Sequence, residues 1–310
     1  MRVIRQLTLG GPEVLELTEA PRPEPAPTEV LVRVGAAGVN PVDWKTRARG
    51  GALGEPPFTV GWDLAGVVEA VGRGVTRFVP GDRVFGMPRF PRAAAAYAEY
   101  ATSPSRQLAR TPGGIDDIEA AALPLAGLTA WQALVETADV QPDDRVLILA
   151  AAGGVGHLAV QIAKARGAYV LGTARAAKHP FLAGLGADET IDYTSESIEE
   201  RVRDADVVLD LVGGETGLRA LPALRDGGLF IAVPSSSGLE PLLEAAGDRV
   251  RVTGILVEPD RAGMEALAGL VEADKLRAHV TRTFPLEEAA AAHEASESGR
   301  TQGKLVLTVC

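Results

Sequence analysis

The residues best suited to chemistry in this sequence form a glycine-rich turn, which reads AAGGVG over residues 151–156. The apolar run RVLILA over 145–150 precedes it and predicts a buried strand. After the turn, apolar residues recur from Val155 at i, i+3, i+4 and i+7, which predicts a helix that ends at Gly167. A strand, such a turn and a helix in this order bind the pyrophosphate of a dinucleotide, because helix N-termini favour anions.

Within the turn, Ala151 stands where the usual fingerprint has its first glycine. That position requires only a tight turn, so alanine can serve there if its φ is negative. Gly153 allows the backbone to approach the pyrophosphate, and Gly156 allows the helix to pack closely on the strand. The alternative is a glycine-rich turn without a ligand. The residues expected to contact the cofactor in this turn are Ala152, Gly153, Gly154, Val155 and Gly156.

The residues after the second strand of this region bear on which dinucleotide binds. A domain that prefers NAD carries Asp or Glu about 20 residues after the fingerprint, where the carboxylate bonds the ribose 2′-OH. Here the sequence has Thr173, Arg175 and Lys178, and no acidic residue before Asp188. A guanidinium and an ammonium group suit a 2′-phosphate, so the sequence predicts NADP(H). The alternative is that Arg175 and Lys178 only solvate a helix surface.

Composition excludes several classes of function. The net charge of −10 argues against nucleic acid or an anionic membrane surface as the main partner. No apolar run is long enough to span a membrane, and the first residues lack the features of a secretory signal, so a cytoplasmic location is expected. The single cysteine, Cys310, rules out an intramolecular disulfide and makes a cysteine metal site implausible.

The pattern of elements predicts two domains. Short strands between turn residues are expected over 29–39, 61–72 and 81–87, which is typical of an antiparallel barrel or sandwich. A helix is expected over 118–136, and after it strands and helices alternate, which indicates a doubly wound parallel sheet. The strands of this second region are expected over 145–150, 168–173, 189–193, 206–212, 227–233 and 251–256. A further helix is expected over 261–276, and strands over 278–284 and 304–309 are expected to return to the first domain.

Several motifs in chain order carry a resemblance to a known superfamily. They are AAGVNPVDWK, GWDLAGVVEAVG, PGDRVFG, ALPLAGLTAW, AAAGGVGHLAVQIAK and GRTQGKLVLTV. In this order they resemble the medium-chain dehydrogenase/reductase superfamily. The resemblance implies an α/β plus β fold, with a GroES-like barrel domain over 1–120 that 276–310 complete. It also implies a Rossmann domain, a doubly wound parallel sheet that binds NADP, over 121–275.

The zinc-dependent alcohol dehydrogenases of that superfamily resemble this chain but differ at the metal. Their first catalytic zinc cysteine aligns with Asn40, their zinc histidine and its neighbouring glutamate align with Trp62 and Asp63, and their structural zinc lobe has no counterpart here. Zinc requires thiolate, imidazole or carboxylate donors, which an amide and an indole cannot replace. The sequence therefore resembles the zinc-free quinone oxidoreductase branch, whose members reduce quinones or the C=C bond of α,β-unsaturated carbonyls with NADPH.

Without a metal, hydrogen bonds must polarise the acceptor. We expect Asn40 to orient the carbonyl or the nicotinamide edge, and Asp43 to bond the nicotinamide ribose or to order a proton path. Trp62 is expected to wall the substrate cavity, and Tyr97 to donate a proton or to lie on a lid. The alternatives are a loop cap for Asn40, a turn residue for Asp43 and core packing for Trp62. Asp63, in a strand, is expected to be structural.

The resemblance implies further contacts with the cofactor. Thr129 resembles the family's threonine near the nicotinamide phosphate, and Tyr193 a tyrosine near the adenosine phosphate. Lys304 resembles a C-terminal residue that reaches the cofactor, although a surface lysine of a hairpin is an equal alternative. Residues just after strands of the second domain complete the expected set: Val212, Gly213, Pro234 and Ser235.

These observations predict an oxidoreductase that transfers hydride from NADPH to a quinone, or to the β-carbon of an enone, without zinc. One alternative is an alcohol dehydrogenase or ketoreductase, and another is an enoyl reductase of a biosynthetic pathway. A third is an NADPH-binding protein with a regulatory or structural role and no turnover. The resemblance also implies a homodimer formed through the edge of the Rossmann sheet, near residues 250–256.

Overall fold

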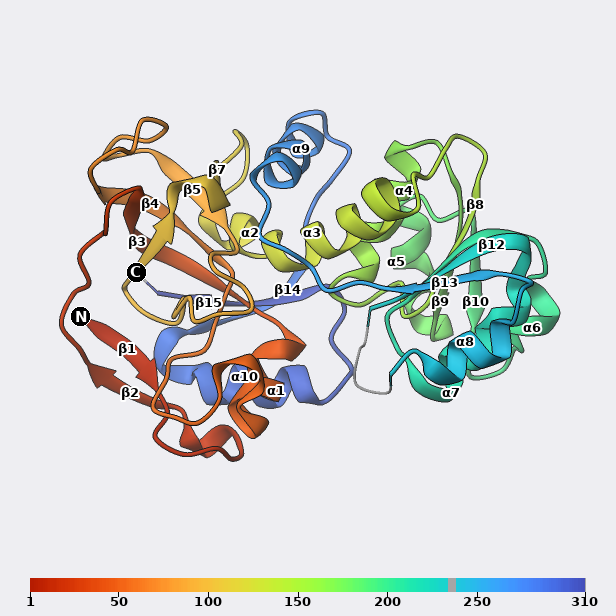
Figure 1. Ribbon diagram of the computed structural model, residues 1–310, viewed down its shortest axis with the longest axis horizontal. Coiled ribbons are helices and arrows are strands. Elements are labelled where there is room, and N and C mark those ends of the chain that lie inside the picture. The colour runs from red at the N-terminus through yellow and green to blue at the C-terminus, as the bar shows by residue number, and fades with distance from the viewer. Residues whose placement is uncertain (234–237, 310) are drawn as a thin grey trace. The chain divides into compact units, whose positions relative to one another are not determined.

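The computed structural model of the chain describes residues 1–233 and 238–309. These residues form two compact units, coloured along the chain in Figure 1. Unit 1 comprises Met1–Leu128 and Glu258–Cys310, and unit 2 comprises Thr129–Val257. The division of the domains at residues 120 and 276 stays a prediction.

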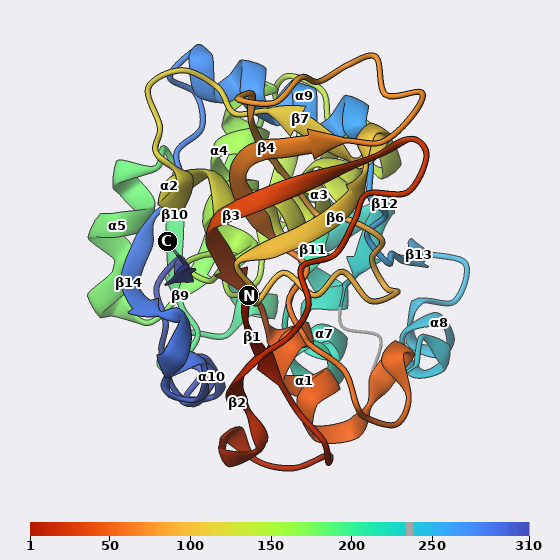
Figure 2. The same cartoon turned by 90° about the vertical axis from the view of Figure 1, so that its left-hand side faces the viewer.

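Unit 1 is built on a seven-stranded sheet in the order β14-β15-β3-β4-β5-β7, with β6 also paired to β3. Neighbouring strands are antiparallel, except that β14 and β15 are parallel. Figure 2 shows β3, β4, β6 and β7 of this sheet. Its strands are β3 (Glu29–Val39), β4 (Leu64–Val71), β5 (Arg83–Gly86), β6 (Tyr100–Pro104), β7 (Leu108–Arg110), β14 (Val280–Pro285) and β15 (Lys304–Thr308). A separate two-stranded sheet pairs β1 (Arg2–Arg5) with β2 (Glu16–Glu19).

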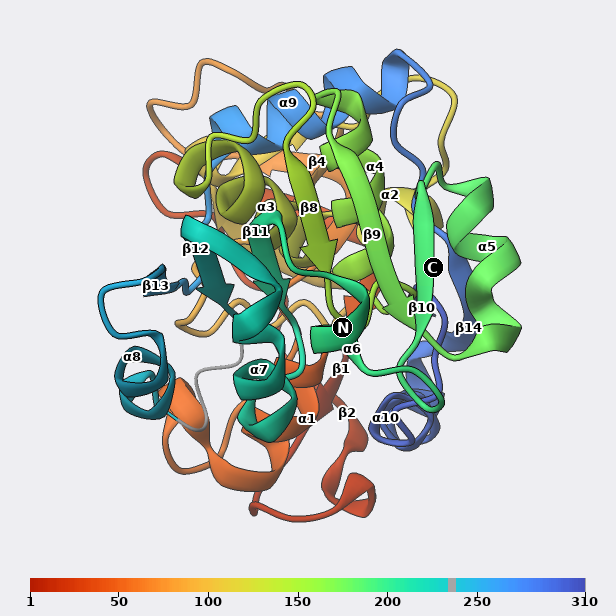
Figure 3. The ribbon, with the colours of Figure 1, turned by 90° about the vertical axis from the view of Figure 1, so that its right-hand side faces the viewer.

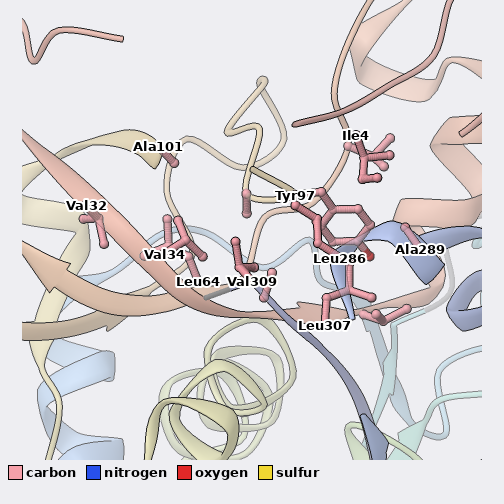
Figure 4. Close-up of a cluster of buried hydrophobic side chains, with 14 of the residues drawn as sticks. Ile4, Val32, Val34, Leu64, Tyr97, Ala101, Leu286, Ala289, Leu307 and Val309 are labelled. Atoms are coloured by element: carbon pink, nitrogen blue, oxygen red, sulfur yellow. The ribbon is translucent and has the colours of Figure 1, made fainter. Parts of the chain in front are cut away.

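The core of unit 1 lies on this sheet and draws on residues from both ends of the chain. Val34 and Leu64 of the sheet pack with Ile4, Leu286 and Leu307, all at most 1% exposed. In Figure 4, Ile4 and Leu286 lie beside Tyr97, whereas Val34 and Leu64 lie farther along the cluster. Burial of each such aliphatic side chain stabilises the fold by about 1.5–3 kcal/mol. The helices of the unit are α1 (Pro41–Arg49), α2 (Asp117–Ala121), α9 (Arg261–Glu272) and α10 (Ala289–Glu297).

Unit 2 is built on a six-stranded sheet in the order β10-β9-β8-β11-β12-β13, in which all neighbours are parallel (Figure 3). Its strands are β8 (Arg145–Ile148), β9 (Tyr169–Ala174), β10 (Glu189–Asp192), β11 (Ala205–Asp210), β12 (Leu224–Ala232) and β13 (Arg251–Gly254). The chain moves outward in one direction from β8 and in the other from β11, so the strand order reverses between these two strands. Ligands of doubly wound sheets bind beyond the carboxyl ends of the strands at such a point. The predicted fold class, a GroES-like domain with a Rossmann domain, is confirmed.

Helices connect these parallel strands. They are α4 (Gly156–Ala165), α5 (His179–Gly184), α6 (Ile198–Arg201), α7 (Gly214–Ala220) and α8 (Glu240–Ala246). α4 packs on β8 and β9, α5 on β10, and α8 on β13. No helix among the described residues is both long enough and apolar enough to cross a membrane.

The single helix predicted over 118–136 is wrong. The structure has α2, then α3 (Pro124–Trp131), then a π-helical segment over Gln132–Thr137. Pro124 explains the break, because proline has no N–H to continue the preceding helix and disfavours helical backbone at the residue before it. The same proline is well suited to begin α3.

Candidate active site

The glycine-rich turn of unit 2 directly follows β8. Ala150 has a φ of 50°, whereas the φ of Ala151 is not positive. Ala151 therefore meets the condition under which alanine can replace the first glycine. The turn is fixed by β9, because the Ala150 N–H donates to Thr173 Oγ1 over 3.0 Å and the Ala151 N–H donates to the Thr173 carbonyl over 2.9 Å. Sequence reasoning missed Ala150, which takes the left-handed conformation that the turn requires.

Two glycines of this turn face different surroundings. A Cβ atom at residue 156 would lie 2.5 Å from the Ala150 carbonyl oxygen and 2.6 Å from Ala151 Cα, so close packing of helix on strand requires glycine there. A Cβ atom at residue 153 would meet only the Ala150 oxygen, at 3.2 Å, among the described atoms. A side chain at residue 153 therefore requires a much smaller rearrangement of the fold than one at residue 156. The glycine leaves room for a ligand to approach the backbone, which fits the pyrophosphate of a nicotinamide cofactor.

The loop after β11 lies beside this turn, since β8 and β11 are neighbours in the sheet. Asp210 ends the strand, and its Oδ1 accepts hydrogen bonds from the N–H groups of Val212 (2.8 Å) and Gly213 (2.9 Å). Gly213 has a φ of 80° and a ψ of −174°, a conformation essentially restricted to glycine. Burial raises the pKa of Asp210. Sequence reasoning named Val212 and Gly213 but missed Asp210, which holds their loop in place.

The basic residues predicted to select NADP follow β9. The Arg175 Nε–H donates to Tyr193 Oη over 3.2 Å, which brings together two residues that sequence reasoning named for different reasons. Burial and, after it, the charge of Arg175 lower the pKa of Lys178. The two cations are therefore close enough to repel each other, and an anion bound between them would relieve that repulsion.

Three other residues were predicted to contact the cofactor, and the structure describes one of them. Thr129 lies in α3 and is 3% exposed. Pro234 and Ser235 lie outside the described residues. What each contributes to cofactor binding stays a prediction.

Unit 1 contains a buried polar cluster of Asn40, Asp63 and Lys304, each at most 2% exposed. Lys304 Nζ donates to the Val39 carbonyl over 3.1 Å and to Asn40 Oδ1, and lies 3.6 Å from Asp63 Oδ2. Asn40 Nδ2 donates to Asp63 Oδ2 over 2.8 Å. The Leu125 N–H donates to Asp63 Oδ1 over 2.8 Å.

This cluster fixes the orientation of the Asn40 amide. Its oxygen accepts from Lys304 and one hydrogen of its Nδ2 goes to Asp63, so the second Nδ2 hydrogen is not used within this cluster. Burial lowers the pKa of Lys304 and raises the pKa of Asp63, and each shift is opposed by the charge of the other group. Lys304, which sequence reasoning assigned to the cofactor, thus positions Asn40 in this structure.

A second buried group adjoins the cluster, and its centre is Asp43 in the first turn of α1. Asp43 Oδ2 accepts from the Asn40 N–H over 2.6 Å and from the Tyr97 hydroxyl over 3.1 Å. Burial is the main cause that raises the pKa of Asp43 to about 7. Burial and the nearby carboxylate raise the pKa of Tyr97 well above its usual value, so this hydroxyl keeps its proton and acts as a donor.

His293 of α10 joins this group and was missed from the sequence. Its Nε2 lies 3.2 Å from Tyr97 Oη, and its Nδ1 lies 3.4 Å from Nη1 of Arg47. The spacing held a signal, because Ala289, Ala292 and His293 fall at i, i+3 and i+4 and all are buried. A histidine on the apolar face of a helix requires polar partners inside the protein. No comparable pattern marks Arg47.

Trp62 is 1% exposed and packs in the interior of unit 1. Its Nε1–H donates to the Arg92 carbonyl over 2.8 Å, and its ring meets that of Phe90 edge to face at 5.4 Å. These contacts describe core packing, the alternative considered from the sequence. A wall of the substrate cavity stays a prediction for this residue.

Two family models match the chain: "Alcohol dehydrogenase GroES-like domain" over residues 26–113 and "Zinc-binding dehydrogenase" over residues 185–307. The 2-haloacrylate reductase of Burkholderia sp is 36% identical, with 96% of each chain covered. The solved quinone oxidoreductase of Coxiella burnetii is 38% identical with a TM-score of 0.94, covering 100% of this chain and 99% of that one. The Escherichia coli quinone oxidoreductase complexed with NADPH is 32% identical with a TM-score of 0.90, covering 99% of this chain and 100% of that one.

Together with the doubly wound sheet and the glycine-rich turn, these matches define the class of protein as a nicotinamide-dependent oxidoreductase. The chain belongs to the quinone oxidoreductase family of the medium-chain dehydrogenase/reductase superfamily.

Asn40 and Trp62 do not fit a zinc ion, although one of the matching family models is described as a zinc-binding dehydrogenase. Both polar ends of the Asn40 amide are engaged within its cluster, and the Trp62 indole offers a donor and no lone pair. Among residues 1–233 and 238–309, no group of three or more His, Cys, Asp or Glu side chains could hold a metal ion.

Proposed function

We propose that this protein reduces quinones, or the C=C bond of α,β-unsaturated carbonyl compounds, with NADPH and without a metal. The observation that carries the proposal is the buried Asn40 amide, held by Lys304 and Asp63 with one N–H left to donate. A single neutral donor polarises an acceptor weakly compared with a metal ion. Conjugated acceptors suit it, because the negative charge that develops on them is delocalised.

The residues of unit 2 are assigned to the cofactor. When bound, the nicotinamide supplies a hydride from its C4 atom. The backbone of residues 152–156 binds the pyrophosphate at the start of α4, and the loop held by Asp210 lies at the carboxyl end of the neighbouring strand. Arg175 and Lys178 hold the 2′-phosphate of NADPH. The complex of the Escherichia coli relative with NADPH supports the choice of this cofactor.

The residues of unit 1 are assigned to the acceptor. Asn40 donates its second Nδ2 hydrogen to the acceptor carbonyl, so the amide orients the acceptor and stabilises the charge that develops on its oxygen. Lys304 and Asp63 hold the amide in that orientation. Burial of the cluster strengthens these interactions by excluding water.

The test is oxidation of NADPH and of NADH against a panel of quinones, alkenals, cyclic enones, simple ketones and simple aldehydes. We expect turnover with quinones or conjugated acceptors, and kcat/KM at least about tenfold higher with NADPH than with NADH, a free-energy difference of about 1.4 kcal/mol. Tight NADPH binding without oxidation of any acceptor would instead identify a binding protein. Turnover confined to simple ketones and aldehydes would identify a ketoreductase.

We also propose a homodimer in the cytoplasm. β13 is the edge strand of the six-stranded sheet, and Leu256 beyond it is 63% exposed. An open strand edge beside an apolar side chain supports pairing with a second copy through a two-fold axis. Sedimentation velocity measures this state directly.

A further inference from the structure

The two carboxyl oxygens of Asp43 have different surroundings. Oδ2 accepts two hydrogen bonds, from the Asn40 N–H and the Tyr97 hydroxyl. Oδ1 is buried and has no hydrogen-bond partner among the described residues. A neutral Asp43 therefore carries its proton on Oδ1, because Oδ2 already receives two hydrogens. A buried oxygen without a partner is also costly, so a bound group that pairs with Oδ1 would remove that cost.

A chain of hydrogen bonds with a single direction leads to Oδ2. Arg47 has only donors, so His293 Nδ1 accepts from it and the His293 proton lies on Nε2. That Nε2–H donates to Tyr97 Oη over 3.2 Å, which leaves the Tyr97 hydroxyl hydrogen to point to Asp43. Each donor in the chain is thus fixed by the group before it.

These hydrogen bonds orient His293 and Tyr97 but cannot deliver a proton to Asp43. The Arg47 guanidinium does not release a proton in proteins, and it pairs with Glu297 over 2.5 Å. Burial and the charge of Arg47 lower the pKa of His293 to about 3, so the ring stays neutral. Exchange of a proton at Asp43 is therefore left to Oδ1.

We propose that Asp43 Oδ1 carries the proton that the reduction consumes, and that Arg47, His293 and Tyr97 are positioning residues that direct the proton to that atom. The inference rests on the proposed function. It names the proton donor of that reaction, which the hydride alone leaves unassigned.

The step balances as follows for an enone. The hydride forms a C–H bond at the β-carbon, and the π electron pair moves to give an enolate. The O–H bond at Oδ1 breaks, and its proton passes to the α-carbon or the enolate oxygen, directly or through one hydroxyl or water. For a quinone, the proton goes to the phenolate oxygen. The acceptor is reduced, the cofactor is oxidised, and water returns a proton to the Asp43 carboxylate.

The charges around Asp43 place this exchange near neutral pH. The pKa of Asp43 is about 7 because burial and the Asp63 charge raise it, while the Asn40 and Tyr97 donors and the Lys304 charge lower it. The other facing groups are neutral His293 and the pair of Arg47 with Glu297. Turnover should therefore fall as pH rises through about 7, since the carboxyl then loses its proton.

The first test removes the proton or one donor. Asp43→Asn keeps an oxygen for both hydrogen bonds and should lower kcat at least about 100-fold and abolish the falling limb of the pH profile. Tyr97→Phe removes one donor to the carboxylate, so that limb should move up by about one pH unit. Tyr100→Phe, a partly exposed tyrosine on β6, is the matched control and should leave the limb in place.

The second test distinguishes positioning from packing. Glutamine at 293 accepts from Arg47 and donates to Tyr97, so His293→Gln should retain the wild-type limb, whereas His293→Leu should shift it as Tyr97→Phe does. A limb that stays in place in both Tyr97→Phe and His293→Leu, or Asp43→Asn with wild-type turnover, would overturn the inference.

Failure of the proposed function can be told apart from failure of this inference. If none of the acceptors supports oxidation of NADPH by the wild-type protein, the protonation of Asp43 can still be measured. Infrared difference spectra of the wild-type protein and Asp43→Asn report the carboxyl group directly. A protonated carboxyl band that disappears through about pH 7 in the wild-type protein alone supports the assignment of the proton. Absence of that band at pH 6 or below, roughly one unit under this pKa, overturns it.

Discussion

Arg175 and Lys178 carry the choice of cofactor on two side chains. Their mutual repulsion lowers the pKa of Lys178 in addition to the effect of burial. NADPH and NADH differ only in the 2′-phosphate, so the effect of these cations should appear with one cofactor and not with the other. Tyr193, which accepts from Arg175, holds the guanidinium at the end of the strand.

Replacing both cations should therefore change specificity and not catalysis. Arg175→Ala combined with Lys178→Ala should raise the KM for NADPH at least about 100-fold, since each charge-assisted hydrogen bond contributes about 1.5–3 kcal/mol. The KM for NADH should change little. Arg203→Ala combined with Lys275→Ala, both exposed, is the matched control. Equal losses with the two cofactors would refute the assignment of these residues to the 2′-phosphate.

Single side chains were the part of the site that the sequence predicted least completely. Asn40, Asp43, Tyr97 and Lys304 were each named from the sequence, but for separate roles. The structure joins them in one buried network through contacts such as that between Lys304 and Asn40, which are 264 residues apart. Residue spacing shows neighbours within one strand or helix and cannot show pairs brought together by tertiary structure. The hydrogen bonds that link Arg47 through His293 to Tyr97 were therefore missed.

The glycine-rich turn joins a strand to a helix, and two of its three glycines, Gly153 and Gly156, separate ligand binding from folding. A side chain at 156 collides with backbone atoms of Ala150 and Ala151, whereas one at 153 meets a single oxygen at 3.2 Å. All the contacts are with backbone atoms, but those at 156 are at 2.5–2.7 Å and require a large shift, whereas the one at 153 requires the Ala150 oxygen to move by a few tenths of an ångström. The same substitution at the two positions should therefore have different effects.

Gly156→Ala should destabilise the apoprotein by about 1–3 kcal/mol, the usual cost of forcing extra volume into a packed site. Gly153→Ala should change stability by no more than about 0.5 kcal/mol, yet weaken NADPH binding at least about tenfold, because the methyl group blocks the approach of the phosphates. Urea unfolding without cofactor and titration with NADPH measure the two effects. The interpretation fails if Gly153→Ala binds NADPH as the wild-type protein does.

Most strands were predicted because their signals are local, although β1, β2, β6 and β7 of unit 1 were missed. The strand predicted over 29–39 is β3 (Glu29–Val39), and the other predicted strands each overlap a strand of the structure. The strand predicted over 145–150 ends earlier, at Ile148, because Ala150 already takes the left-handed conformation of the turn. The helix over 118–136 failed at Pro124, where an unbroken apolar period concealed a change of element.

Two of the buried groups, His293 and Asp43, give the stability of the protein opposite responses to pH. Burial lowers the pKa of His293 to about 3, so His293 contributes stability above its unfolded pKa, about 6.5, that is lost as pH falls. Burial raises the pKa of Asp43 to about 7, so Asp43 contributes stability at low pH that is lost as pH rises from about 4. Between about pH 4 and pH 6.5 the two contributions oppose each other.

Replacing one of these two groups should reveal the pH dependence of stability that the other causes. Relative to the wild-type protein, His293→Gln should gain about 1.4 kcal/mol of unfolding free energy for each unit by which pH falls from about 6 to about 4.5. Asp43→Asn should show the reverse slope and gain stability as pH rises over the same range. Urea unfolding of all three proteins at a series of pH values gives these differences. Curves that run parallel to that of the wild-type protein would contradict the buried titrations.

The buried cluster also has a consequence for synthesis on the ribosome. Lys304 follows Asn40 by 264 residues, and all of unit 2 lies between them. At about 5–20 residues per second, roughly 13 to 53 seconds separate the translation of the two residues. During that interval the nascent chain can complete unit 2, which is continuous in sequence, while Asp63 of unit 1 still lacks its cation. The native interior of unit 1 therefore closes only when β15 has left the exit tunnel.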